Sequence, residues 1–135
     1  MYRSKKEIAF ANICSQVVGN FETNPSDILG TPDLFFREMN VAIFFNGCFW
    51  HSHPCRARKV NEEWSCKLSR IKQNDKMVLQ RLAHEGIATL TVWECLWEKS
   101  VEEQLERIYD YLYLAKNHGM RVRKNGSKSS VSIVA

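Results

Sequence analysis

The stretch VAIFFNGCFWHSHPC, residues 41–55, joins an apolar run to a segment that holds two cysteines and two histidines. Its first five residues are apolar and include β-branched and aromatic side chains, so they predict a strand that is buried on both faces of a sheet. From Asn46 to about residue 60, neither the helical nor the strand period is visible. We therefore expect a structured loop that is held together by something other than apolar packing.

Patterns on both sides of this stretch predict further helices and strands. A capping box at Ser4 predicts the start of a first helix, which should end near Gly19, and a strand follows at residues 33–36. After the quoted stretch, the pattern predicts an amphipathic helix at residues 62–85 and a strand at residues 87–93. A second capping box at Ser100 predicts the start of a last helix. This order of elements predicts an α/β domain whose central sheet is flanked by helices.

Length and composition limit the classes of protein that this chain can represent. With 135 residues, of which 44% are hydrophobic, it suits one globular domain, which we place at residues 1–117, followed by a basic tail at residues 118–135 whose order the sequence leaves open. No run approaches the ~20 apolar residues of a membrane span, so we expect a cytoplasmic protein without membrane contact. The net charge of +4 permits nucleic acid as a partner without demanding it.

Three cysteines and one histidine form a candidate metal site. The chain has five cysteines, and this odd number does not suit a closed disulfide framework. Three thiolates and one imidazole are ligands that suit tetrahedral Zn²⁺, and such a closed site would be structural. The expected ligands are Cys48, His53, Cys55 and Cys95. The alternative is that these cysteines are inert buried residues.

A carboxylate near the first predicted strand suggests hydrolytic chemistry. Asp33 follows Pro32 where the strand starts, and a carboxylate at a sheet edge can hold a hard cation such as Mg²⁺. Pro-Asp is also a common turn pair, so this residue alone decides little. Together with Glu7 on the first helix and an imidazole-rich loop, it suggests a phosphodiesterase in which a metal offsets phosphate charge and a histidine activates water.

These residues resemble the very short patch repair (Vsr-type) DNA mismatch endonucleases over about residues 7–97. The resemblance rests on GTPD at residues 30–33, GCFWHSHPC at residues 47–55 and VWEC at residues 92–95, with Trp64, Lys67, Asp75, Leu82 and Gly86 between them. It implies a bacterial enzyme of the PD-(D/E)XK, restriction-endonuclease-like fold. That fold has a central mixed sheet flanked by helices, and in this family it carries a structural zinc site.

The resemblance also implies roles for the catalytic residues. Asp33 would bind the catalytic Mg²⁺, His51 would transfer a proton to or from the attacking water, and Glu7 would support the site electrostatically. The same comparison implies the four zinc ligands that spacing suggests. Where the family has a threonine-histidine pair before the glycine, this chain has Phe45 and Asn46. Asn46 can offer hydrogen bonds at that position but no proton at neutral pH.

Aromatic and basic side chains are the candidates for DNA contact. The resemblance implies an aromatic wedge that enters the DNA stack beside a mispair, where unstacking costs least, and its members would be Phe49, Trp50 and Trp64. Core packing is the alternative, and Trp50 could instead cover the zinc. The predicted phosphate contacts are Arg56, Arg58 and Lys59 after the loop, Lys67 on the long helix, and the basic residues of the tail. For the helix, a solvated charged face is the alternative.

Together these features predict a Mg²⁺-dependent DNA endonuclease, and the resemblance implies that it nicks one strand of double-stranded DNA beside a T·G mismatch. We expect a monomer, encoded by a bacterium or a phage, with mismatch-repair proteins as candidate partners. Two alternatives stay open at this point. One is a site-specific nicking endonuclease of a phage or mobile element on the same scaffold, and the other is a cleavage-deficient, zinc-stabilised DNA-binding module, which Asn46 motivates.

Overall fold

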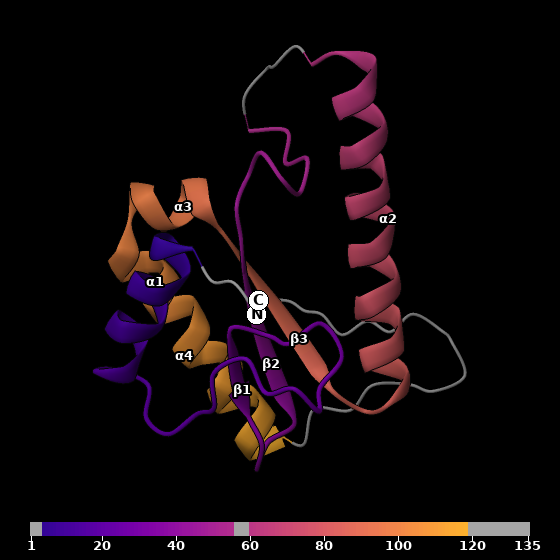
Figure 1. Ribbon diagram of the computed structural model, residues 1–135. Coiled ribbons are helices and arrows are strands. Elements are labelled where there is room, and N and C mark those ends of the chain that lie inside the picture. The colour runs from indigo at the N-terminus through magenta and orange to yellow at the C-terminus, as the bar shows by residue number, and fades with distance from the viewer. Residues whose placement is uncertain (1–3, 56–59, 119–135) are drawn as a thin grey trace.

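The computed structural model describes residues 4–55 and 60–118, which form four helices and three strands (Figure 1). In chain order these elements are α1 (Lys5–Ser15), β1 (Leu34–Phe36), β2 (Val41–Asn46), α2 (Glu62–His84), β3 (Ala88–Trp93), α3 (Glu94–Lys99) and α4 (Val101–His118). The described residues contain no helix that is long and apolar enough to cross a bilayer. Apart from His118, the predicted basic tail lies outside the described residues.

The strands form one mixed sheet in the order β1-β2-β3. β1 pairs antiparallel with β2, with Phe35 opposite Ala42, and β2 pairs parallel with β3, with Asn46 opposite Trp93. A parallel pair needs a crossover connection, and the segment that contains α2 provides it. The prediction of a mixed central sheet is therefore confirmed, and β2 is its middle strand, as its buried side chains require.

Each face of the sheet is covered by helices (Figure 1). Because side chains alternate between the two faces of a strand, successive residues join different cores. The core beneath α1, α3 and α4 includes Leu34, Phe36, Val41, Ile43, Phe45, Leu90 and Val92. The smaller core beneath α2 includes Phe35, Ala42, Val78, Leu82 and Ile87. The sheet is thus the middle of three layers. The loops at the ends of its strands lie outside the two cores, so they can carry polar side chains.

The first helix is shorter than the sequence predicts. The capping box at Ser4 is present, but α1 ends at Ser15 instead of near Gly19. The N–H groups of Val17 and Val18 both donate to the Cys14 carbonyl, at 3.0 and 2.9 Å, so the chain closes into a turn directly after the helix. The apolar residues that suggested a longer helix therefore lie in this turn.

A short helix, α3, follows β3 at residues for which the sequence pattern predicts neither a helix nor a strand. Trp97 explains this helix, because its ring lies edge-on to the rings of Phe10 and Phe45, with centroids 4.8 and 6.2 Å away. Only 7% of Trp97 is exposed. Tertiary packing therefore decides the local structure, and the predicted start of α4 follows at once, where Glu103 N–H donates to Ser100 Oγ at 3.2 Å.

Candidate active site and metal centre

Four side chains that the sequence analysis names as catalytic line one cavity of about 260 Å³. They are Glu7 from α1, Asp33 from the turn before β1, Asn46 from the end of β2 and His51 from the loop that follows. These residues are up to 44 positions apart in the chain, and the sheet brings them together. Asp75 of α2 lines the same cavity from the opposite side of the loop.

Asp33 is held in place by a tight turn and by the neighbouring strand. Gly30 and Thr31 have positive φ angles of 82° and 39°, which form the turn before β1. A Cβ atom on Gly30 would lie 2.7 Å from Val78 Cγ1, so α2 also requires glycine there. Asp33 is 7% exposed, and its Oδ2 accepts a hydrogen bond of 2.7 Å from Phe45 N–H. The carboxylate is therefore fixed at the edge of the cavity.

His51 is oriented by a carboxylate from the long helix. Its Nδ1 contacts Oδ2 of Asp75, and the two side chains are only 24% and 30% exposed. Its backbone N–H donates to the Gly47 carbonyl at 3.2 Å, which fixes the loop. A carboxylate at Nδ1 selects the tautomer in which Nδ1 carries the proton. Nε2 is then the ring nitrogen that can accept a proton from water in the cavity.

Glu7 has a structural contact as well as a place in the cavity. It is the third residue of α1, and its N–H donates to Ser4 Oγ at 3.2 Å while Ser4 N–H donates to Glu7 Oε1 at 3.3 Å. These reciprocal bonds satisfy two backbone donors at the start of the helix. The same carboxylate is therefore held in one orientation where it faces the cavity.

The donors around Asp33 fit a magnesium ion. Asp33 offers carboxylate oxygen and Asn46 offers amide oxygen, and Mg²⁺ prefers such hard oxygen ligands. Within residues 4–55 and 60–118, no group of three acidic, histidine or cysteine ligand atoms gathers at Asp33. This also suits Mg²⁺, which is usually held by one or two carboxylates together with water and substrate phosphate.

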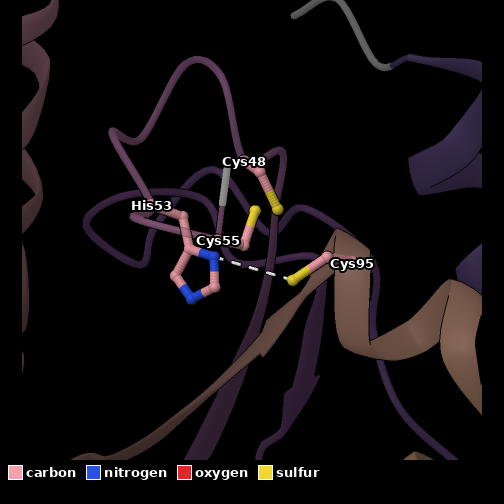
Figure 2. Close-up of side chains that lie close together, drawn as sticks. All are labelled: Cys48, His53, Cys55 and Cys95. Atoms are coloured by element: carbon pink, nitrogen blue, oxygen red, sulfur yellow. Dashed lines mark hydrogen bonds between the residues drawn. The ribbon is translucent and has the colours of Figure 1, made fainter. Parts of the chain in front are cut away.

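The four predicted zinc ligands gather into one cluster (Figure 2). The sulfur atoms of the three cysteines and a ring nitrogen of His53 all lie within 4.8 Å of one another, and Cys95 Sγ is 3.6 Å from His53 Nδ1. In a tetrahedral zinc site with Zn–S bonds of about 2.3 Å and Zn–N bonds of about 2.0 Å, neighbouring ligand atoms are about 3.5–3.8 Å apart. The cluster therefore fits Zn²⁺ after small side-chain rotations.

The residues of this cluster could hold a soft cation. Cys48 is 4% exposed, and this burial raises the pKa of its thiol to about 12. A cation in the cluster would stabilise the thiolates, so metal binding would release protons. The His53 ring stacks on the Trp93 ring, with centroids 4.2 Å apart and planes 20° apart. This stacking holds the imidazole at the end of β3, next to Cys95.

The three predicted wedge residues form an aromatic cluster at the surface. The ring centroids of Phe49, Trp50 and Trp64 are 5.3–5.7 Å apart, although Trp64 comes from α2 and the other two come from the loop. Phe49 is 37% exposed and Trp50 is 47% exposed, so neither is a core residue. Lys67 places its ammonium group 5.0 Å from the Trp64 ring centroid. Aromatic surface and positive charge thus occur side by side.

Only one of the other predicted DNA contacts that are named here lies among the described residues. Lys67 is exposed on α2, but Arg56, Arg58 and Lys59 lie outside the described residues. Of the two remaining cysteines, Cys14 is buried in α1 and Cys66 is exposed on α2, as expected of ordinary helix residues.

Two functional candidates were given no role by the sequence analysis. Asp75 interrupts the apolar pattern of α2, and this interruption is a signal that a polar partner faces the helix. Glu94 lies between β3 and the ligand Cys95, and its Oε1 accepts a hydrogen bond of 3.1 Å from Cys48 N–H. Local sequence could not show this second contact, because the two residues are 46 positions apart.

Comparison with known proteins agrees with this arrangement of residues. A family model described as DNA mismatch endonuclease Vsr matches residues 3–57. The chain is 34% identical to the DNA mismatch endonuclease Vsr of Escherichia coli over 100 residues, which cover 68% of this chain and 64% of that protein. It is 29% identical to the Type II nicking enzyme V.XorIIP of Xanthomonas oryzae pv. oryzae over 113 residues, which cover 79% and 83% of the two chains. It is 30% identical to the Type II nicking enzyme V.HpaIIP of Haemophilus parainfluenzae over 95 residues, which cover 67% of each.

The fold and these relatives define a DNA endonuclease with the restriction-endonuclease-like arrangement of a mixed sheet between helices. More specifically, the chain belongs to the Vsr family. The resemblance that the sequence analysis describes is therefore confirmed at the level of family, fold class and enzyme class. The roles of individual site residues stay predictions.

Proposed function

We propose that this protein is a Mg²⁺-dependent endonuclease that nicks one strand of double-stranded DNA beside a T·G mismatch. The convergence of Glu7, Asp33, Asn46 and His51 on one cavity carries this proposal, because it combines a hard-cation ligand with a proton acceptor. The aromatic cluster and Lys67 give a surface beside the cavity that suits contact with DNA bases and phosphates.

Asp33 would hold the magnesium ion, and Asn46 would lie beside it. When bound, Mg²⁺ supplies positive charge that offsets the negative charge of the scissile phosphate. The Asp33 carboxylate is suited to this task because its hydrogen bond to Phe45 N–H prevents it from rotating away. Asn46 would donate a hydrogen bond to a phosphate oxygen from its amide nitrogen.

His51 would accept the proton of the attacking water at Nε2. The Asp75 carboxylate at Nδ1 would keep the ring in the required tautomer and stabilise the positive charge that forms on the imidazole. Glu7, held by the capping box, would add a negative charge on the opposite side of the cavity. That charge would help to stabilise a cation in the cavity and the protonated imidazole.

Zinc would have a structural role at the cysteine-histidine cluster. Cys48, His53, Cys55 and Cys95 would hold it, which joins the loop to the start of α3. Four protein ligands leave no open position for substrate, as is typical of structural zinc. Because His51 lies between two of these ligands in the chain, the cluster would also fix the backbone that carries the proton acceptor.

The aromatic cluster would select the mispair. Inserting side chains such as Trp50 and Trp64 between base pairs costs a few kcal/mol of stacking energy, and that cost is lowest where pairing is already weak. A T·G pair therefore becomes a preferred entry point. This preference concerns binding geometry, so it can be measured separately from the cleavage step.

Strand cleavage on a panel of end-labelled duplexes tests the proposal. The panel contains one T·G duplex, its matched counterpart and duplexes with other mispairs, each incubated with the protein and Mg²⁺. We expect a nick in one strand of the T·G duplex and much slower cleavage of the matched one. Absence of cleavage on the whole panel, with binding retained, would favour the cleavage-deficient module instead.

A second candidate function is site-specific nicking without mismatch preference. It is favoured by the names of two relatives, which describe them as Type II nicking enzymes. In that case matched duplexes that contain a particular sequence would be cut as fast as mispaired ones. Comparing matched and mispaired duplexes in several sequence contexts distinguishes the two candidates.

A further inference from the structure

Three charged side chains and one backbone N–H form a network that links the first helix to the loop at residues 47–55, which we call the metal-binding loop. Lys6 Nζ contacts Oε2 of Glu94 and lies 2.9 Å from Oε2 of Glu98. The other carboxylate oxygen of Glu94 accepts the Cys48 N–H at 3.1 Å. Glu94 is the most protected of the charged members, with 21% of its side chain exposed against 59% for Lys6 and 51% for Glu98.

The two ends of this network lie next to residues of the cavity. Lys6 directly precedes Glu7 on α1, and Cys48 is the second residue of the loop that carries His51. A neighbouring hollow is lined by Lys6, Glu7, His51 and Glu94, so these side chains surround the same space. Glu94 is the side chain that contacts both the helix and the loop.

The backbone of Glu94 is itself firmly placed. It follows the last residue of β3 and is the first residue of α3. The buried ring of Trp97, one turn further on, packs against Phe10 of α1 and Phe45 of β2. The carboxylate therefore extends from a fixed position, and its two oxygens contact two different partners.

We propose that Glu94 is a positioning residue that fixes α1 and the metal-binding loop relative to each other, so that Glu7 and His51 keep their spacing across the catalytic cavity. This inference rests on the proposed nicking function. Through the Cys48 N–H, Glu94 also orients a metal ligand, so the cluster and the cavity share one support. An error of about 1 Å in the placement of reacting groups can slow a reaction up to a hundredfold.

The two contacts of Glu94 can be removed separately. Lys6→Met removes the ammonium group but leaves the carboxylate on Cys48 N–H. Glu94→Gln keeps an oxygen acceptor for that N–H but loses the charge that attracts Lys6. Glu94→Ala removes both contacts. The matched control is Glu98→Gln, which removes only the outer partner of Lys6, and Lys6→Arg is the conservative variant that should restore function.

The experiment measures single-turnover nicking of a T·G duplex at saturating and at limiting DNA concentrations, with full-length protein. We expect the maximal rate to fall about tenfold in Lys6→Met and Glu94→Gln, while the DNA concentration for half-maximal rate changes less than about twofold. Lys6→Arg and Glu98→Gln should retain at least about half of the wild-type rate. Thermal melting of each variant verifies that it is folded.

A spectroscopic measurement tests the metal end without activity. Co²⁺ replaces zinc, and the visible absorption of its thiolate complex is recorded for each variant. We expect the wild-type spectrum in Lys6→Met and Glu94→Gln, and shifted bands in Glu94→Ala, because only this variant removes the side-chain oxygen that contacts Cys48 N–H.

The outcomes separate this inference from the proposed function. If the wild-type protein nicks DNA but Lys6→Met is equally fast, the positioning role is wrong. It is also wrong if Lys6→Met raises the half-saturating DNA concentration tenfold at an unchanged maximal rate, because Lys6 would then be a DNA contact. If the wild-type protein does not nick any duplex, the proposed function fails. Independently of cleavage, an unshifted Co²⁺ spectrum in Glu94→Ala would overturn the link between Glu94 and the metal ligand Cys48.

Discussion

The contact between Asp75 and His51 leads to a quantitative prediction. Asp75→Asn keeps the size of the side chain but removes the charge that holds the proton on His51 Nδ1. The asparagine amide can instead donate to Nδ1, which places the imidazole proton on Nε2, where it blocks the acceptance of a proton from water. The variant should therefore bind DNA normally and cleave it slowly.

The size of the effect follows from the role and the exposure of the pair. A positioned general base contributes about 10²–10⁴ in rate. Because the two side chains are 24% and 30% exposed, water can partly replace the lost contact, so we expect the lower end of that range. A hundredfold loss corresponds to ~2.7 kcal/mol in activation free energy. The half-saturating DNA concentration should change less than about twofold, since Asp75 acts through His51 and not on the DNA.

The assay is single-turnover nicking of a T·G duplex with saturating enzyme, so that product release does not limit the rate. Asp110→Asn, an exposed acid on α4, is the matched control and should cleave at the wild-type rate. In a His51→Ala background, Asp75→Asn should have almost no further effect, because the two residues act as one unit. If Asp75→Asn cleaves DNA at a rate within threefold of wild type, Asp75 does not orient His51 for proton transfer.

Three further predictions concern the metal cluster, the buried thiol and the wedge. In a chelator competition, Cys55→Ser should bind Zn²⁺ at least tenfold more weakly than wild type. The control variant Cys66→Ser, which changes an exposed cysteine outside the cluster, should bind Zn²⁺ as tightly as wild type. Equal Zn²⁺ affinities of Cys55→Ser and wild type would show that Cys55 is not a ligand. Burial raises the pKa of the Cys14 thiol to about 12, above its ordinary value near 9. As the pH rises, the unfolded state therefore loses this proton first, and the stability that the neutral thiol contributes is lost between about pH 9 and pH 12. In denaturant melts over this range, the free energy of unfolding should decline less steeply with pH in Cys14→Ala than in wild type. An equal slope in the two proteins would contradict this prediction. Trp64→Ala should reduce the preference for T·G over matched DNA about tenfold, measured by competition binding, and an unchanged preference would argue against the wedge.

Much of the fold is predictable because each strand has an unambiguous local pattern. The apolar run at residues 41–45, rich in β-branched and aromatic residues, favours a strand that is covered on both faces, and it forms the middle strand β2. The helix α3 was not predictable, because its formation depends on Trp97 packing against Phe10 and Phe45 from distant parts of the chain. The early end of α1 likewise depends on a turn that closes onto the Cys14 carbonyl.

The candidate site was predictable where residue chemistry is specific. Two thiols and an imidazole within residues 48–55, together with a further thiol at Cys95, have few uses besides a metal, and the four residues do form one cluster. The partners of these residues could not be predicted in the same way. Asp75 and Glu94 are ordinary acidic residues on helices, and only the tertiary structure places one on His51 and the other on Cys48 N–H.

In the proposed mechanism, Asp33 holds the Mg²⁺ that is needed to cleave one DNA strand. The most direct measurement is nicking of an end-labelled T·G duplex by wild type and by Asp33→Asn, with and without Mg²⁺. Asparagine retains an oxygen that can accept the Phe45 N–H, so the fold should survive the substitution while the charge that holds the ion is lost. We expect one nicked strand with wild type and Mg²⁺, and at least a hundredfold slower cleavage in Asp33→Asn or without the metal. Cleavage by Asp33→Asn at the wild-type rate, or by wild type in the absence of any divalent metal, would contradict it.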